Sequence, residues 1–214
     1  PPAIAAAAIL HFHGGEGVQA MLALGLVALG GMAVGAAVIF GRAGAEDRAE
    51  WGHGAAIALI AYLAAIALLP NIAIGWALAL AAAAVLLALP KWYHLALSLL
   101  AIAAGWALPT VALWSSTLTP ALAGTPASTA DLPGLASIAN RIVPVALLAV
   151  LAGWRLDSQR RELRIFSGAL AIALLVIAAH VLFRQLFAFA QPDDFIARGL
   201  MERTLWQGLL LVAG

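Results

Sequence analysis

Long apolar runs without a charged side chain constrain the fold of this chain more than any other feature. Val18–Phe40 contains no Asp, Glu, Lys or Arg, and the runs Ile72–Leu89 and Leu95–Trp114 repeat the pattern. A helix of about 20 such residues crosses the roughly 30 Å hydrocarbon core of a bilayer. Such a helix also satisfies its own backbone hydrogen-bonding groups, which the bilayer core cannot do. The sequence therefore predicts an integral membrane protein.

The overall composition agrees with this prediction. Of the 214 residues, 64% are hydrophobic and only 10% are charged, whereas a soluble domain carries about 25% charged residues. The net charge is +1 and no basic block is present, so we expect the lipid bilayer as a partner and no nucleic acid. The chain has no cysteine, which excludes disulfides, thiolate metal ligands and a cysteine nucleophile. No sequence motif predicts a cofactor.

Both ends of the chain lie inside apolar runs. The run Pro2–Phe12 and the run Leu205–Gly214 are each too short to cross a bilayer alone. We therefore expect residues 1–214 to form a single transmembrane helical region that is a fragment of a longer chain. Other membrane protein chains, or the missing parts of its own chain, are then expected as partners.

The expected fold class is all-α: a polytopic transmembrane helix bundle with about six full spans and two partial terminal ones. The expected full spans are Val18–Phe40, Ala55–Leu69, Ile72–Leu89, Leu95–Trp114, Ile142–Trp154 and Ile165–Phe187. Pro70 is expected to separate two spans at a tight hairpin, and Pro109 is expected to kink its helix. The span Ile142–Trp154 is short, and a start within residues 135–141 stays open.

Lysine and arginine in the loops predict the orientation. The loops 41–54, 90–94 and 155–164 carry seven of these residues, and the opposite side carries four. Because positive residues favour the cytoplasmic side, we expect these three loops to be cytoplasmic. The loops 115–141 and 185–203 then face the periplasm. The Ala- and Leu-rich composition suggests the inner (cytoplasmic) membrane of a bacterium.

A polar cluster near the start of the chain is a candidate metal site. His11 and His13 lie beside a glycine pair that is followed by Glu16, and two imidazoles with a carboxylate are suitable zinc ligands. Residues two apart on a helix point to different faces, so only the glycine-rich break brings them together. The alternative interpretation is a polar helix end with a flexible turn.

His180 and Arg184 are the functional candidates inside a predicted span. They are spaced i, i+4 and therefore share one face of the helix. Ionisable residues within spans are functional candidates by default. In the alternative, structural interpretation, Arg184 reaches the outer interface and His180 hydrogen-bonds a neighbouring helix. No catalytic residue is assigned.

Aromatic residues lie near the predicted helix ends, as in an aromatic belt at the membrane interfaces. They are Trp51, Trp92, Tyr93, Trp114, Trp154 and Trp206. No predicted span carries Asp, Glu or Lys near its centre, although ion-coupled transporters usually place such groups on their pathway.

The pattern of helices and loops in the chain resembles that of a known family. Ala- and Leu-rich helices are separated by short loops, and an Arg/Glu-bearing turn precedes a new span at Met201–Gln207. This pattern resembles the bacterial many-spanning "predicted membrane protein" family, catalogued as domain of unknown function 2339. The resemblance implies more spans than this chain contains. It implies no activity and no catalytic residues.

The leading functional hypothesis is a non-enzymatic scaffold, or an accessory subunit of a membrane assembly in the bacterial envelope. One alternative is a transporter or flippase for a lipid-linked or amphipathic substrate. Another is an enzyme at the outer interface that acts on lipid-linked glycans, with His11, His13, Glu16 and His180 converging on one site.

Overall fold

The structure is a computed structural model that describes residues 45–122, 131–156 and 160–187, together with residues 204, 207, 208 and 211. Within these ranges the chain is all-helical, as predicted. The elements are α3 (Ala45–Leu68), α4 (Asn71–Ala88), the 3-10 turn η1 (Pro90–Trp92), α5 (Tyr93–Leu122), α6 (Leu135–Ser137), the π-helical turn η3 (Ile138–Ile142), α7 (Val143–Arg155) and α8 (Arg161–Phe187).

Five helical segments of the described chain are long and apolar enough to cross a membrane, which is the pattern of a multi-pass membrane protein. They are Glu50–Leu68, Asn71–Ala88, Pro90–Thr117, Leu135–Arg155 and Arg161–Leu186. Each corresponds to one predicted span. The predicted span Val18–Phe40 and the partial runs at both ends lie outside the described residues.

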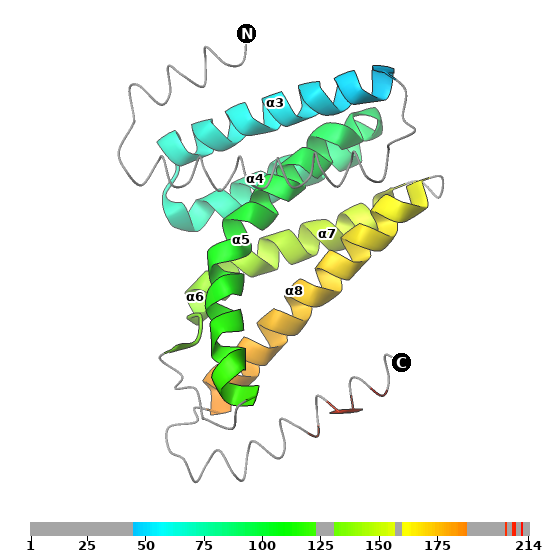
Figure 1. Cartoon of the computed structure of the whole chain (residues 1–214). Helices are drawn as coiled ribbons and strands as arrows, with labels where there is room; N and C mark the ends of the chain where they lie inside the picture. The colour runs from blue at the N-terminus through cyan, green and yellow to red at the C-terminus, as the bar shows by residue number, and fades with distance from the viewer. Residues whose placement is uncertain are drawn as a thin grey trace.

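α5 is the central helix of the described bundle. It packs against α3 and α4, α4 also packs against α7, and α7 packs against α8. Because each long helix reverses the direction of the one before, the bundle has two ends. We call the end with the starts of α3, α5 and α8 the basic end, since Lys91 and Arg161 lie there, and the opposite end the far end. Figure 1 shows the starts of α3 and α8 together on the right.

The two prolines that the sequence singled out behave as expected. α3 ends at Leu68 and α4 begins at Asn71, with Pro70 in the extended conformation between them. This confirms the tight hairpin. Pro109 lies inside α5, where it removes one backbone hydrogen bond. Figure 1 shows that the axis of α5 changes direction partway along its length.

The predicted outer loop 115–141 is wrong at its start, and at its end the earlier start of the next span, which the sequence left open, is the one observed. α5 continues to Leu122, and the next span already begins at Leu135. The hydroxyl groups of Ser115, Ser116 and Thr117 donate to backbone carbonyls three residues earlier, at 2.8, 2.7 and 2.6 Å. Because the helix accepts these hydrogen bonds within its own backbone, the hydroxyl-rich residues 115–117 do not end α5.

The predicted cytoplasmic loops are also shorter than expected. α3 begins at Ala45, inside the predicted loop 41–54, because its Ala-, Glu- and Arg-rich start has a high helix propensity. In the predicted loop 90–94, residues 90–92 form η1 and α5 begins at Tyr93. In the predicted loop 155–164, α7 includes Arg155 and α8 begins at Arg161.

α4 approaches the π-helical turn η3 more closely than a side chain would allow. A Cβ atom on Gly75 would overlap the carbonyl oxygen of Asn140. Pro144 has no N–H to donate to that carbonyl four residues earlier, which disturbs the regular α-helical pattern at this point. The absence of a side chain at Gly75 therefore lets the backbone of α4 pack directly on η3.

Candidate functional site

The two candidates from the sequence lie together at the far end of α8, and both are buried. His180 is 6% exposed and Arg184 is 3% exposed. The indole N–H of Trp114 in α5 donates to Nδ1 of His180 at 2.8 Å, and the two rings meet edge to face. Indole nitrogen is only a donor. Nδ1 of His180 is therefore the acceptor in this contact, and the neutral ring carries its proton on Nε2.

This geometry separates the two parts of the structural interpretation. His180 does hydrogen-bond a neighbouring helix, because Trp114 belongs to α5. Arg184 is packed inside the protein, and its position relative to a membrane interface stays a prediction. The next residue, Gln185, donates to the carbonyl oxygen of Pro133 at 3.5 Å. The far end of α8 is thus tied to two segments that are distant in the sequence.

The candidate metal ligands His11, His13 and Glu16 lie outside the described residues. The same holds for their proposed convergence with His180. Within the described ranges, no group of three or more His, Cys, Asp and Glu side chains could hold a metal ion.

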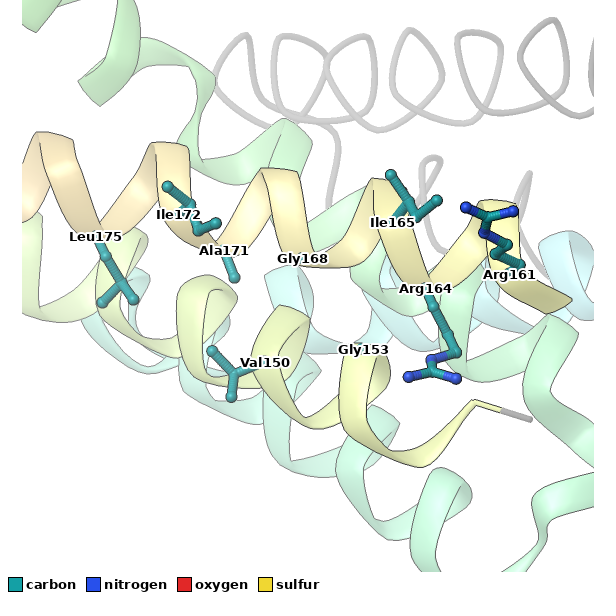
Figure 2. Close-up of a pocket in the computed structure, with 9 residues that line it drawn as sticks. All are labelled: Val150, Gly153, Arg161, Arg164, Ile165, Gly168, Ala171, Ile172 and Leu175. Carbon is teal, nitrogen blue, oxygen red and sulfur yellow. The ribbon is translucent and has the colours of Figure 1, made fainter. Parts of the chain in front are cut away.

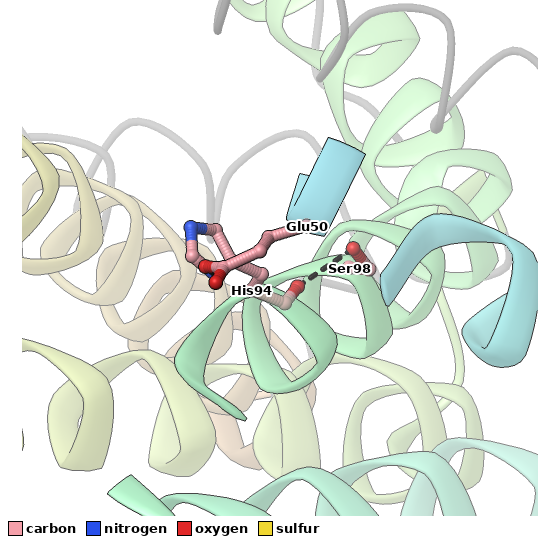
Figure 3. A network of polar contacts seen from close by, with 3 residues as sticks. All are labelled: Glu50, His94 and Ser98. Carbon is pink, nitrogen blue, oxygen red and sulfur yellow. Dashed lines mark hydrogen bonds and ion pairs between the residues drawn. The ribbon is translucent and has the colours of Figure 1, made fainter. Parts of the chain in front are cut away.

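A second polar contact, at the basic end, was not found from the sequence. Glu50 at the start of α3 places Oε2 3.3 Å from Nδ1 of His94 at the start of α5. The histidine side chain is 5% exposed and the carboxylate is 63% exposed. The hydroxyl of Ser98 donates to the backbone carbonyl of His94 at 2.7 Å. Figure 3 shows Glu50 reaching over His94 from α3.

An open cavity of about 320 Å³ lies beside this contact, and the side chains of Glu50, His53, Lys91 and His94 help to line it. An imidazole beside a carboxylate can pass a proton between the protein and water. Glu50 is solvent-exposed, so its side of this pair is open to water. The cavity also combines a cation, Lys91, with the flat ring of Trp92.

Close packing of α3 on α5 holds the Glu50–His94 pair in place. A Cβ atom on Gly54 would lie 3.0 Å from the backbone of His94 and Leu95. The guanidinium of Arg160 lies 3.4 Å from the centre of the Tyr93 ring, within the range of a cation–π contact. Residues from three separate segments therefore meet at the basic end.

The predicted aromatic belt holds for only part of its members. Trp92 is 52% exposed and Trp154 is 74% exposed, as expected of belt residues. Tyr93 is buried, and the indole N–H of Trp114 donates a hydrogen bond to His180. Tyr93 therefore packs inside the protein and Trp114 contacts a neighbouring helix, while the belt itself stays a prediction. Trp206 lies outside the described residues.

Sequence spacing carried no signal for either buried histidine contact. Glu50 and His94 belong to different helices, and so do Trp114 and His180. The predicted topology placed the members of each pair at the same side of the membrane. Which helices are neighbours at that side depends on their packing, which periodicity does not reveal.

Comparison with known proteins identified no relative of this chain. No family model, no curated protein and no solved structure matches this chain.

Proposed function

We propose that this chain is a non-enzymatic membrane protein that serves as a scaffold, or as an accessory subunit of a larger assembly in the bacterial inner membrane. The observation that carries the proposal is the distribution of its polar contacts. Four of those among the described residues join two separate segments of the chain, and they lie at both ends of the described bundle. An arrangement of this kind fixes the positions of helices.

The individual contacts support a structural role. Trp114 and His180 join α5 to α8, and Glu50 and His94 join α3 to α5. The guanidinium of Arg141 in η3 lies 4.8 Å from the ring centre of Trp106 in α5. Contacts between helices of this kind, above all the buried hydrogen bond of Trp114 with His180, make a packed bundle more rigid. A rigid bundle suits a protein that presents surfaces to other membrane chains.

Large apolar side chains on the outer faces supply such surfaces. Ile72, Leu80 and Leu87 of α4 are 66%, 63% and 51% exposed. In a bilayer these side chains contact either lipid tails or the helices of a partner. Shape complementarity, rather than the hydrophobic effect, would select a partner there.

The proposed orientation places the basic end in the cytoplasm. Lys91, Arg155, Arg161 and Arg164 lie at this end and are exposed, which fits the preference of positive residues for the cytoplasmic side. A flippase for an amphipathic substrate and an enzyme at the outer interface are the alternatives. The candidate residues of the enzyme, other than His180, lie outside the described chain.

The test uses a double variant, His180→Ala with Arg184→Ala, in the complete natural protein. The tagged protein is purified from its own membrane in mild detergent, and native mass spectrometry gives the mass and stoichiometry of the particle. A scaffold or subunit should form a particle with fixed partner stoichiometry. The variant should lose thermal stability and assembly together, because its effect is structural.

The contrary result is a variant that folds and assembles as the natural protein does but abolishes the cellular phenotype. That result would assign chemistry to His180 and Arg184 and overturn the proposal. A particle containing only this protein, in every detergent tested, would also overturn it. Ala169→Leu is the matched control, because Ala169 is exposed on the same helix.

A further inference from the structure

An apolar groove with a basic mouth runs between α7 and α8. Its volume is about 700 Å³, and Val150, Ile165, Ala171, Ile172 and Leu175 supply its apolar lining. Figure 2 shows Val150 and Ala171 pointing toward one another across the gap. This volume falls within the range of about 300–1,000 Å³ that ligand sites of proteins occupy.

The groove has the length of one leaflet of a bilayer. Its lining on α8 extends from Arg161 to Leu175, which is about 21 Å at a rise of about 1.5 Å per residue. A bilayer with its headgroup regions is about 40–45 Å thick, so half of it matches the groove. Arg161 and Arg164 lie at the start of α8, and Ile172 and Leu175 lie further along the helix.

The groove is basic at its mouth and apolar in its interior, which matches the charged headgroup and the apolar acyl chains of a phospholipid. Arg161 and Arg164 are exposed and help to line its mouth, and Figure 2 shows Arg164 reaching toward α7 near Gly153. The acidic residue of this first turn, Glu162, is not part of the lining. Arginine binds phosphate oxygens through two parallel hydrogen bonds. The mouth is therefore suited to an anionic headgroup, and the interior to an acyl chain.

Two glycines give the groove its shape. A Cβ atom on Gly153 would be in ordinary contact with the backbone of α8, at 3.6 Å from the nitrogen of Gly168. A Cβ atom on Gly168 would meet nothing within 4 Å. The helices thus approach closely at Gly153, while Gly168 borders open space that a bound chain can fill.

We propose that this groove binds one anionic phospholipid from the leaflet at the basic end of the bundle. The headgroup phosphate binds Arg164, which reaches toward α7, Arg161 adds positive charge from the same helix turn, and one acyl chain follows Ile172 and Leu175 into the membrane. Anionic lipids are abundant in the cytoplasmic leaflet, so the proposal agrees with the proposed orientation but does not depend on the scaffold function.

The experiment measures lipid selection by the full chain in nanodiscs of phosphatidylcholine mixed with phosphatidylglycerol. Native mass spectrometry of the released protein counts the lipids of each kind that stay bound. We expect phosphatidylglycerol to be enriched over its share in the disc. Each basic residue near the surface contributes about 1 kcal/mol, so R161Q/R164Q should lower the enrichment by roughly tenfold to thirtyfold. The charge-preserving pair R161K/R164K should retain most of it.

Matched controls separate a built site from general attraction. K91Q/R155Q removes the same charge from the same end of the bundle, outside the groove, and should lower the enrichment clearly less than R161Q/R164Q does. Gly168→Leu fills the groove and should reduce the retention of phosphatidylglycerol. Ala169→Leu adds the same side chain to an exposed position outside the lining and should not. Circular dichroism melting confirms that every variant is folded.

Four results would overturn the proposal. Equal losses in R161Q/R164Q and K91Q/R155Q would indicate diffuse electrostatic attraction. Unchanged retention in folded Gly168→Leu would place the lipid elsewhere. Displacement of the lipid by free glycerol phosphate would indicate a site for soluble anions. Crosslinks from residue 172 to a second copy, or to another segment of the chain, in the lipid-filled disc would show that protein covers the groove.

Discussion

The two ends of the bundle use the same structural devices in different solvent environments. Each end has a buried histidine, His94 or His180, that contacts a neighbouring helix. Each half also has a glycine at a close backbone contact, Gly54 or Gly75. The partner of His94 is a carboxylate that is 63% exposed, whereas the partner of His180 is a half-buried indole.

Each half of the bundle also has an arginine beside a buried aromatic ring, and here the two halves are alike, because both arginines are half-buried. Arg160 at the basic end lies 3.4 Å from the ring centre of Tyr93. Arg141, in the turn that starts the fourth described span, lies 4.8 Å from the ring centre of Trp106 in the interior of α5. The difference between the two histidine contacts teaches that one structural device can occur in two solvent environments. The contact of His94 ends on a carboxylate that is open to water, whereas the contact of His180 ends on a ring that is packed between helices.

Substitution of Gly75 should have the largest effect on stability. Gly75→Ala places a Cβ atom on the carbonyl oxygen of Asn140, and the backbone there cannot rotate away as a side chain can. We expect a loss of about 3 kcal/mol in the free energy of unfolding, the upper part of the usual range for overpacking. Chemical unfolding in detergent micelles, followed by tryptophan fluorescence, measures this loss.

The corresponding substitution at the basic end sharpens the comparison. Gly54→Ala gives a contact of 3.0 Å without overlap, so its cost should be smaller than that of Gly75→Ala. Gly52→Ala is the control, because its Cβ atom would meet nothing within 4 Å. If Gly75→Ala were no more destabilising than Gly52→Ala, the close packing of α4 on η3 would be refuted.

Removal of one donor at the far end should have an intermediate effect. Trp114→Phe keeps an aromatic ring but removes the N–H that donates to His180. Hydrogen bonds between membrane helices contribute about 0.6–2 kcal/mol, so we expect a loss of about 1 kcal/mol in the same unfolding experiment. Trp154→Phe is the control, because Trp154 is 74% exposed. Equal losses in both variants would mean that the hydrogen bond adds no stability.

Neutralisation of the carboxylate at the basic end should have the smallest effect on stability. Glu50→Gln removes the charge beside His94 but keeps the size of the side chain. Because Glu50 is largely exposed, water and salt screen this contact, and the expected loss is at most about 0.5 kcal/mol. Unfolding at low and high salt checks this expectation. A loss above that of Trp114→Phe would contradict the division between the two ends.

The helices and several of their ends could be predicted from the sequence, but the start of α3 and the end of α5 could not. All five described spans coincide with apolar runs, because continuous apolar sequence has few alternatives to a membrane helix. The boundary at Ser115 was predicted wrongly, since hydroxyl side chains can bond to the carbonyls of their own helix. The start at Leu135 was left open because the π-helical turn has no clear sequence signature.

The candidate site was predictable only in part. The i, i+4 spacing identified His180 and Arg184 as neighbours on one face of α8, and the structure places both inside the protein. The contact of Glu50 with His94 depends on how α3 crosses α5, and the groove depends on how α7 approaches α8 at Gly153. No local pattern encodes these crossings.

The sequence by itself determined that the chain is a helical protein of the membrane, because only a bilayer accommodates so many long uncharged runs. It also placed Arg155, Arg161 and Arg164 near the ends of two predicted helices. The tertiary structure alone decided which arginine does what: Arg160 lies on a tyrosine ring, whereas Arg161 and Arg164 line the mouth of an apolar groove. The physical reason is that helical periodicity fixes the faces of each helix, whereas side-chain packing between helices decides which faces meet.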